Sequence, residues 1–282
     1  TPTLSSAASD VYKRQGSIAV VEVSNAEGVN VGDVIQGGLY GGWQEYFLMP
    51  GEKVIKIPVN MGLPLPAFLS VLGLTGLTAY FCLLDVGKPK SGETVVVSAA
   101  AGAVGSIVCQ IAKIKGCHVV GIAGSDEKCD WLRNDLGVDS AINYKSEDVL
   151  AALKKYCSNG IDIYFENVGG EILDAALTLM NKFGRIPVCG LISMYNDWSV
   201  PEPKMLKNIL MKRLTVQGFI ILDYLDRMEE SLQALSQWIA EGKIQYRVDI
   251  VDGIENAPTA LSKLFTGENQ GKLLIQTSKV ES

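Results

Sequence analysis

The sequence predicts an α/β protein in which a doubly wound parallel sheet is joined to a smaller, β-rich part. Between residues 94 and 189, short apolar runs rich in β-branched residues alternate with segments of helical periodicity, a pattern typical of parallel sheets. A glycine-containing turn joins the first apolar run directly to the first helix. Before residue 57, by contrast, strand-like runs follow one another with only turn-forming residues between them.

The elements are expected in a regular order along the chain. The strands expected in the β-rich part are Ile18–Val23, Val34–Ile35 and Trp43–Leu48. The strands expected in the parallel sheet are Thr94–Ser98, His118–Ile122, Ala141–Asn143, Ile161–Phe165 and Arg185–Cys189. The helices expected between them are Gly105–Lys115, Glu127–Leu136, Val149–Cys157 and Ile172–Met180. Strand-like segments return between Arg247 and Ile275, around a helix at Ala257–Phe265.

The composition excludes several classes of function. The 282 residues carry a formal net charge of −6, so we expect no nucleic acid and no membrane as a partner. The uncharged stretch from Ile57 to Leu84 is broken by prolines and glycines, which favours a buried connection and a core helix over a membrane span. His118 is the only histidine, which excludes most histidine-dependent nucleophilic and metal chemistry. The six cysteines show no C-x-x-C spacing, which predicts reduced, buried thiols in a cytoplasmic protein.

The strongest single motif is the turn that follows the first strand of the parallel sheet. It reads Ala99-Ala-Ala-Gly-Ala-Val-Gly105 and leads directly into a helix. Gly102 would let the backbone approach a pyrophosphate, and Gly105 would let the helix pack closely on the strand. The helix N-terminus would attract the phosphate charge. Although Ala100 replaces the first glycine of the usual fingerprint, the strand–turn–helix context predicts dinucleotide binding.

The end of the second strand of that sheet selects the cofactor. An NAD site has an acidic residue there for the ribose 2′-hydroxyl, but this chain has Gly124-Ser125, with Lys128 one helical turn later. A cation without that carboxylate suits a 2′-phosphate, so the expected cofactor is NADP(H). Alternatives stay open, because Lys128 could be a solvated helix charge. The nearby Asp126 and Glu127 either argue against a phosphate or simply decorate a helix N-terminus.

Eight motifs in order then resemble a known family. They are Ala99–Gly105, Gly124-Ser125-x-x-Lys128, Asn143-Tyr144-Lys145, Asn167–Gly170, Cys189–Ser193, Tyr195-Asn196, Gly218–Tyr224 and Glu268–Lys272. The set resembles the zinc-independent medium-chain dehydrogenases/reductases, in the group of leukotriene B4 dehydrogenase/prostaglandin reductase, alkenal double-bond reductase and curcumin-reductase-like enzymes. The resemblance covers nearly all of residues 16–277, and implies a Rossmann sheet with a partial, GroES-like catalytic domain. Glu166 departs from the commoner aspartate, and Leu74-Thr75 from a Met-Pro pair.

The resemblance also implies roles for single residues. Lys128 and Tyr144 match family contacts to the 2′-phosphate, with Ser125 beside it. Asn167 would lie near the nicotinamide, and Tyr195 matches a tyrosine that members of the group use in catalysis; the alternative is a structural tyrosine at the strand–loop junction. The other residues expected to contact the cofactor are Ala100, Gly102, Ala103, Val104, Gly105, Cys189, Ser193 and Asn269.

The implied chemistry is conjugate reduction. Hydride passes from NADPH to the β-carbon of an α,β-unsaturated ketone or aldehyde, and a hydrogen-bond donor stabilises the enolate oxygen. Leu74 stands where zinc alcohol dehydrogenases have a catalytic cysteine, and the loop Gly37–Gly42 contains none, so no metal site is expected. The alternatives are a quinone reductase of the same superfamily and an inactive nucleotide-binding fragment. Family members are commonly homodimers, and we expect the same here.

The first fifteen residues look foreign. The DNA that would encode Asp10 to Gln15 resembles a transposon end used to prepare sequencing libraries, and Thr1 to Ser9 is small and polar. The alternative is an ordinary disordered terminus. On the first interpretation the chain is truncated at its N-terminus. The expected division is a foreign segment 1–15, a remnant of the β-rich domain 16–72, an NADPH-binding domain 73–245 and a return to the β-rich domain 246–282.

Overall fold

The computed structural model describes residues 16–38, 40–58, 62–195 and 203–278. Its largest feature is a six-stranded parallel sheet in the order β6-β5-β4-β7-β8-β9. The strands are β4 (Thr94–Val97), β5 (His118–Ala123), β6 (Ser140–Asn143), β7 (Ile161–Phe165), β8 (Met180–Val188) and β9 (Thr215–Gly218). The strand order reverses between β4 and β7, where doubly wound sheets bind ligands. The predicted fold class is confirmed, whereas the expected foreign segment 1–15 and Asn196 lie outside the described residues.

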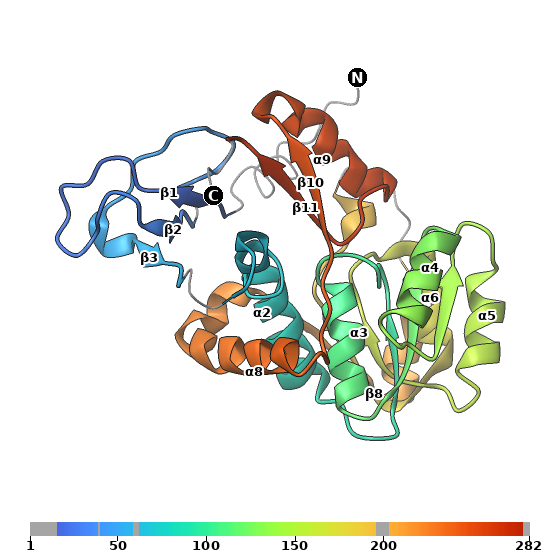
Figure 1. Cartoon of the computed structure of the whole chain (residues 1–282). Helices are drawn as coiled ribbons and strands as arrows, with labels where there is room; N and C mark the ends of the chain where they lie inside the picture. The colour runs from blue at the N-terminus through green and yellow to red at the C-terminus, as the bar shows by residue number, and fades with distance from the viewer. Residues whose placement is uncertain (1–15, 39, 59–61, 196–202, 279–282) are drawn as a thin grey trace.

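Helices cover both faces of the parallel sheet (Figure 1). One face carries α2 (Leu74–Phe81), α3 (Gly105–Ile114), α4 (Asp126–Asn134) and α8 (Met228–Ala240). The other face carries α5 (Val149–Tyr156), α6 (Gly170–Leu179) and α7 (Lys207–Lys212). Because side chains alternate along a strand, Val95 and Val97 pack with the first group of helices and Val96 with the second. Strands buried on both faces explain the continuous apolar runs in the sequence.

Residues 57–84 contain the expected buried connection and core helix. A 3₁₀ turn at Leu65–Leu69 leads to α2, which continues as the π-helical turn Cys82–Gly87. The Tyr80 ring of α2 lies 6.0 Å from the Trp238 ring of α8, and its hydroxyl donates to Glu230. The stretch is therefore uncharged because it packs inside the protein. Within the described ranges, no helix has both the length and the apolar character needed to cross a membrane.

The β-rich part is smaller than predicted. Its antiparallel strands are β1 (Ile18–Val20), β2 (Val34–Gln36) and β3 (Ile55–Lys56). The predicted strand Trp43–Leu48 is wrong, because these residues have no regular structure and β3 pairs with β2 instead. Tyr46 and Leu48 are 71% and 95% exposed, and a segment with no strand beside it cannot pair its backbone groups in a ladder. Figure 1 shows β1–β3 to one side of the parallel sheet, beyond α2.

Near the C-terminus the predicted strand–helix–strand pattern is confirmed. A two-stranded parallel sheet contains β10 (Val248–Asp252) and β11 (Lys272–Gln276), and α9 (Ala257–Thr266) connects them. Short 3₁₀ turns complete the connections, at Gly51–Lys53, Ile192–Met194, Ile221–Arg227 and Ile254–Asn256. Neither β9 nor α8 was predicted. The division of the chain into domains at residues 72 and 245 stays a prediction.

Candidate active site

The glycine turn lies at the carboxyl end of β4, as predicted. A Cβ atom on Gly105 would lie 2.4 Å from the Ala99 carbonyl oxygen and 2.9 Å from the Cα of Ala100, so only glycine lets α3 start this close to the strand. Ala99 itself has φ of 47°, in the left-handed region that costs a non-glycine residue conformational energy. Ala103 and Val104 are partly exposed and lead into α3. The turn thus presents backbone and a helix N-terminus to a ligand, which suits a pyrophosphate.

The segment before β11 crosses this turn. The Gly271 N–H donates to the Ala101 carbonyl oxygen at 3.3 Å, and Gly271 forms an isolated β-bridge with Gly102. The side-chain amide of Asn269 donates to the Gly271 carbonyl oxygen at 3.0 Å. Residues 169 positions apart in the sequence are therefore adjacent, and Asn269 lies beside the glycine turn.

A second cluster lies at the carboxyl ends of β5 and β6. Ser125 caps α4 by accepting a hydrogen bond from the Lys128 N–H, and the Tyr144 ring lies over Gly124. A Cβ atom on Gly124 would lie 3.0 to 3.3 Å from that ring, so glycine allows the close approach. Tyr144 remains 42% exposed. The structure therefore brings together Ser125, Lys128 and Tyr144, the three residues predicted for the 2′-phosphate.

Two lysines of this cluster are held by carbonyl oxygens at the end of α9. The Lys128 ammonium donates to the Gly267 carbonyl oxygen at 2.7 Å, and Lys145 donates to that of Thr266 at 3.3 Å. Burial and the nearby Lys145 lower the pKa of Lys128. Among the described residues, neither lysine forms an ion pair with a carboxylate. Two close cations without a direct carboxylate partner among the described residues are a favourable environment for a phosphate dianion. Lys145 was not predicted as a site residue.

The two carboxylates beside Lys128 are engaged elsewhere. Asp126 accepts a hydrogen bond from the Asn143 side-chain amide at 2.7 Å, and Glu127 accepts one from Gln270 at 2.6 Å. Each carboxylate thus accepts a hydrogen bond from a neutral amide, although the charge of Glu127 still acts on Lys128 and raises its pKa against the effect of burial. These contacts favour the interpretation of both residues as structural groups at the start of α4.

The third cluster lies at the carboxyl ends of β7 and β8. The Asn167 side-chain amide donates to the Ser98 carbonyl oxygen at 2.7 Å, and the Asn167 N–H donates to Ser98 Oγ at 2.8 Å. Ser193 Oγ donates to the Val168 carbonyl oxygen, and Tyr195 follows directly at the end of a 3₁₀ turn. A Cβ atom on Gly190 would lie 3.5 Å from the Tyr195 hydroxyl and 3.3 Å from the Asn167 carbonyl oxygen. The structure thus brings Tyr195 close to Asn167, and the roles expected for both residues stay predictions.

Cys189 completes this cluster. It directly follows β8, is partly exposed, and its N–H donates to the Glu166 carbonyl oxygen at 2.9 Å. Its thiol is a hydrogen-bond partner of Cys82, and this contact together with burial raises the pKa of Cys82. The five other cysteines are buried, and all six are free thiols.

The chain is similar to several known proteins. A family model described as zinc-binding dehydrogenase matches residues 103–241. The NADPH-dependent curcumin reductase of Escherichia coli (strain K12) is 45% identical over 273 residues, which cover 93% of this chain and 77% of that protein. The NADP(+)-dependent 2-alkenal reductase of Nicotiana tabacum is 46% identical over 250 residues, 88% of this chain and 72% of that protein. The crystal structure of CurA in complex with NADPH from Vibrio vulnificus aligns with a TM-score of 0.87 and 46% identity, over 94% of this chain and 80% of that one.

The chain belongs to the zinc-independent medium-chain dehydrogenases/reductases. Within this family it falls in the group of alkenal and prostaglandin reductases. The predicted family and the oxidoreductase class are therefore confirmed. The roles of individual residues stay predictions, because the comparisons give the relationship of whole chains.

A medium-chain reductase needs a dinucleotide site, and the residues present fit one. The glycine turn, the α3 N-terminus and the Lys128–Lys145 pair lie at the carboxyl ends of adjacent strands, in the sheet order β5-β4-β7 that ends at the Asn167 cluster. Pyrophosphate, 2′-phosphate and nicotinamide would thus meet chemistry that suits each of them. Among the described residues, no group of three histidine, cysteine or carboxylate side chains could hold a metal ion. Leu74, at the position of a zinc-ligand cysteine, begins α2 and is 44% exposed.

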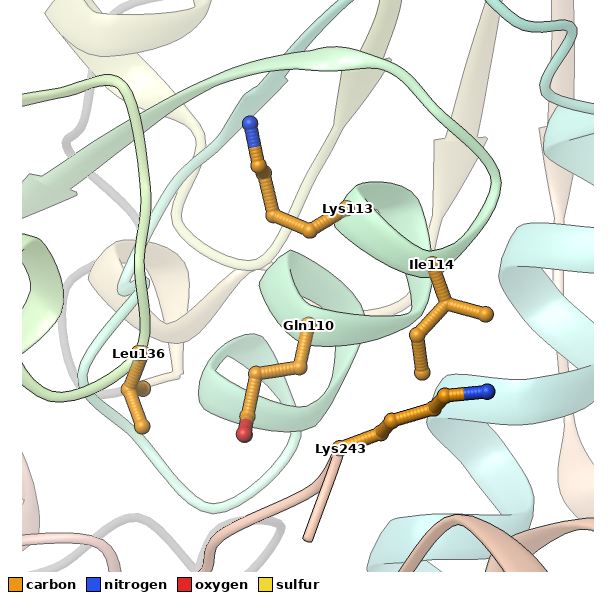
Figure 2. Close-up of a pocket in the computed structure, with 5 residues that line it drawn as sticks. All are labelled: Gln110, Lys113, Ile114, Leu136 and Lys243. Atoms are coloured by element: carbon orange, nitrogen blue, oxygen red, sulfur yellow. The ribbon is translucent and has the colours of Figure 1, made fainter. Parts of the chain in front are cut away.

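A separate surface hollow lies away from these clusters. It has a volume of about 310 Å³ and is lined by Gln110, Lys113, Ile114, Leu136 and Lys243 (Figure 2). Both of its lysines have carboxylate partners, since Lys113 pairs with Asp139 at 2.8 Å and Lys243 with Glu241 at 2.7 Å. The hollow adjoins the C-terminal half of α3, at the opposite end of the helix from the glycine turn. It therefore offers neither the position nor the unpaired charge of a cofactor site.

One further residue of the third cluster was noted in the sequence only as a departure from the family. Glu166 is fully buried at the end of β7, and its Oε1 accepts hydrogen bonds from Ser98 Oγ, the Tyr164 hydroxyl and the Val168 N–H. Burial raises the pKa of this carboxyl. A signal was present in the sequence, because an acidic residue interrupted the end of an otherwise apolar strand.

Proposed function

We propose that the chain reduces the C=C bond of α,β-unsaturated ketones and aldehydes, with hydride delivered to the β-carbon. The cofactor is NADPH, since relatives of 45% and 46% identity are NADPH- or NADP-dependent and a neighbour of 46% identity was solved with NADPH. The substrate class is supported by those two relatives, which are named for curcumin and for 2-alkenals. When bound, NADPH supplies the hydride. The residues of this chain must bind the alkene, stabilise the enolate oxygen and handle a proton.

The observation that carries the proposal is the position of Tyr195 beside Asn167. A phenol is a neutral hydrogen-bond donor, and such a donor stabilises an oxygen atom on which negative charge develops. We assign that role to the Tyr195 hydroxyl. Asn167, Ser193 and Cys189 would border the nicotinamide, and Lys128, Ser125 and Tyr144 would bind the 2′-phosphate. Ala100, Gly102, Ala103, Val104, Gly105 and Asn269 would surround the pyrophosphate.

The test follows oxidation of NADPH at 340 nm with a simple enone, an alkenal and a benzoquinone. We expect turnover of the enone and the alkenal, and a fall in kcat of about 100-fold for Tyr195→Phe, the range of one general acid or oxyanion donor. Tyr156→Phe on α5 is the matched control and should leave kcat unchanged. Quinone reduction with inert enones would assign the chain to the quinone reductases. Cofactor binding without any turnover would overturn the proposed activity for this chain.

A titration separates the two ends of the cofactor. Tryptophan fluorescence should report saturation by NADPH and much weaker binding of NADH, because only NADPH carries the phosphate that Lys128 and Tyr144 would hold. Equal binding of the two dinucleotides would remove these residues from their proposed role.

We also infer that the protein is a homodimer, and that it acts in the cytoplasm. Strand β9 is an edge of the parallel sheet with all four residues exposed, and exposed apolar side chains border it, namely Leu210, Met211, Val216 and Ile220. An unpaired apolar edge pairs readily with a second copy. The free thiols agree with a reducing compartment. Light scattering should give twice the chain mass, and Val216→Lys should give the monomer mass; a monomeric parent protein would contradict the inference.

A further inference from the structure

A buried polar cluster underlies the third group of site residues. Ser98, Tyr164 and Glu166 are each 0% exposed, and they join the carboxyl ends of β4 and β7. Glu166 Oε1 accepts from Ser98 Oγ at 3.0 Å, from the Tyr164 hydroxyl at 3.2 Å and from the Val168 N–H at 2.6 Å. Three donors thus converge on one oxygen atom in the core of the sheet.

The turn that Glu166 holds supports the residues expected at the nicotinamide. Ser98 Oγ, which donates to Glu166, also accepts from the Asn167 N–H at 2.8 Å. The carbonyl oxygens of Asn167 and Val168 accept from the N–H groups of Ile192 and Ser193, both at 3.1 Å. The 3₁₀ turn that ends at Tyr195 is therefore attached to the turn that the Glu166 carboxyl organises. Asn167 and Tyr195 have this carboxyl as a common support.

Stability of the fold does not by itself explain why this polar cluster is buried. Glu166 Oε2 is buried and has no hydrogen-bond partner among the described residues, and a buried polar atom without a partner destabilises the folded state. Apolar residues of similar volume often stabilise a core as well as, or better than, buried ionisable ones. A carboxyl retained at this position is explained by the turn that it orients, since a hydrocarbon side chain could not accept from Val168 and Ser98 together.

We propose that Glu166 is a positioning residue that sets the nicotinamide half of the cofactor site, by orienting both Asn167 and the segment of Tyr195. The proposal rests on the proposed function only in that the bound ligand is NADPH. Glu166 touches neither the cofactor nor the substrate in this role. Its effect passes through the Val168 N–H and Ser98, so loss of the carboxyl should loosen one half of the site and leave the 2′-phosphate cluster intact.

The test compares two ligands on three variants. NADPH spans both halves of the site, whereas adenosine 2′,5′-bisphosphate carries the 2′-phosphate and has no nicotinamide. For Glu166→Ala we expect the Kd of NADPH to rise about tenfold, as for the loss of one hydrogen-bond network, while the Kd of the bisphosphate changes less than twofold. Glu166→Gln keeps an acceptor oxygen and should return the Kd of NADPH to within about threefold of the parent protein.

Asp162→Asn is the matched control, because Asp162 joins the same two strands at their other end. Its Oδ2 accepts from the Thr94 N–H at 2.9 Å, and its Oδ1 accepts from the Asn181 side-chain amide at 2.8 Å. This variant should lower the urea midpoint without changing the ratio of the two dissociation constants. An equal loss of both ligands in Glu166→Ala would show a merely structural role, and unchanged NADPH binding would show none; either result overturns the proposal. No alkene substrate enters these measurements, so they do not depend on which alkene the protein reduces.

Discussion

The two ends of the parallel sheet treat charge differently. At the amino ends of the strands, Arg185 forms an ion pair with Glu93 at 2.5 Å. At the carboxyl ends, Lys128 and Lys145 donate to carbonyl oxygens and Glu166 accepts from hydroxyl and N–H groups, and none of the three forms an ion pair within the described part of the chain. Paired charges stabilise the folded chain, whereas the two lysines, which are held by neutral carbonyl groups, retain attraction for an anionic ligand. Residues that stabilise the fold and residues expected to bind the ligand therefore lie at opposite ends of the same strands.

The largest effect is expected at Gly105, because both the packing of α3 on the sheet and the expected contact with the cofactor depend on this residue. Substitution Gly105→Ala places a methyl group 2.4 Å from the Ala99 carbonyl oxygen, which is backbone and cannot rotate away. We expect a loss of about 3 kcal/mol in the free energy of unfolding, as for severe overpacking, together with loss of NADPH binding. Urea unfolding and a fluorescence titration measure the two effects. Gly218→Ala, with no atom within 4 Å of the added Cβ, is the control and should change the free energy of unfolding little.

A substitution at the amino ends of the strands should change the stability of the fold without changing cofactor binding. Arg185→Ala leaves Glu93 largely buried without its partner, since each side chain of the pair is 19% exposed. The arginine also donates to the Gly87 carbonyl oxygen, at 2.9 Å. We expect a loss of about 2 kcal/mol in the free energy of unfolding, below the range for a fully buried pair, and an unchanged Kd for NADPH. A weakened NADPH affinity in folded Arg185→Ala would break the separation of the two ends.

Much of the fold could be predicted because its signals are local. The strand Val95–Val97 is buried on both faces, so its β-branched run stands out in the sequence. Trp43–Leu48 contains three aromatic residues that are common in strands but has no neighbouring strand, and composition does not reveal pairing partners. Strand β9 was missed for the opposite reason, because its four residues are all exposed and form no apolar run.

The site could be predicted in part for the same reason. The glycine turn is contiguous in the sequence and carries its own signature. Lys145, in contrast, acts through Thr266, which is 121 residues away. Glu166 combines with Ser98, 68 residues before it. The partners of both groups come from distant parts of the chain, so a local pattern, such as an acidic residue at the end of an apolar strand, could mark Glu166 as unusual but could not assign its role.

Removal of one cation at the carboxyl ends of the strands should weaken cofactor binding without changing stability. Lys128→Ala deletes one of two ammonium groups beside Tyr144, and a hydrogen bond to a charged group contributes about 1.5–3 kcal/mol in proteins. Because the remaining Lys145 and solvent compensate in part, we expect the Kd of NADPH to rise about tenfold and that of NADH to stay within twofold. Lys113→Ala removes the same charge at the amino end and is the control. If both variants weakened NADPH equally, the attraction would come from net charge instead of from the cluster.

The test with the smallest expected effect uses pH, because the pKa values of Glu93 and Glu166 are shifted in opposite directions. Burial opposes ionisation of Glu93, but the hydrogen bonds from Arg185 and Lys90 outweigh it, so the pKa of Glu93 lies below its ordinary value of 4.5. Burial raises the pKa of Glu166, and the titratable group in contact with it is Tyr164, whose own pKa burial raises well above its ordinary value of 10.0. The stability from Glu93 is therefore present above pH 4.5 and is lost as the pH falls through the lowered pKa. The stability from Glu166 is present below pH 4.5 and is lost as the pH rises through the raised pKa.

The variants Glu93→Gln and Glu166→Gln, which replace each carboxyl by a neutral amide, measure the two pH dependences separately. Urea unfolding of the protein without cofactor, from pH 3 to pH 8, should show the advantage of the parent over Glu93→Gln shrinking only on the acid side. The advantage over Glu166→Gln should shrink only as the pH rises above 4.5. In each case one proton limits the slope to about 1.4 kcal/mol per pH unit. Parallel profiles for the two variants would mean that both carboxyls ionise in similar surroundings. The proposed contrast between ion-paired groups at the amino ends of the strands and groups without an ion pair at the carboxyl ends would then fail for Glu93 and Glu166.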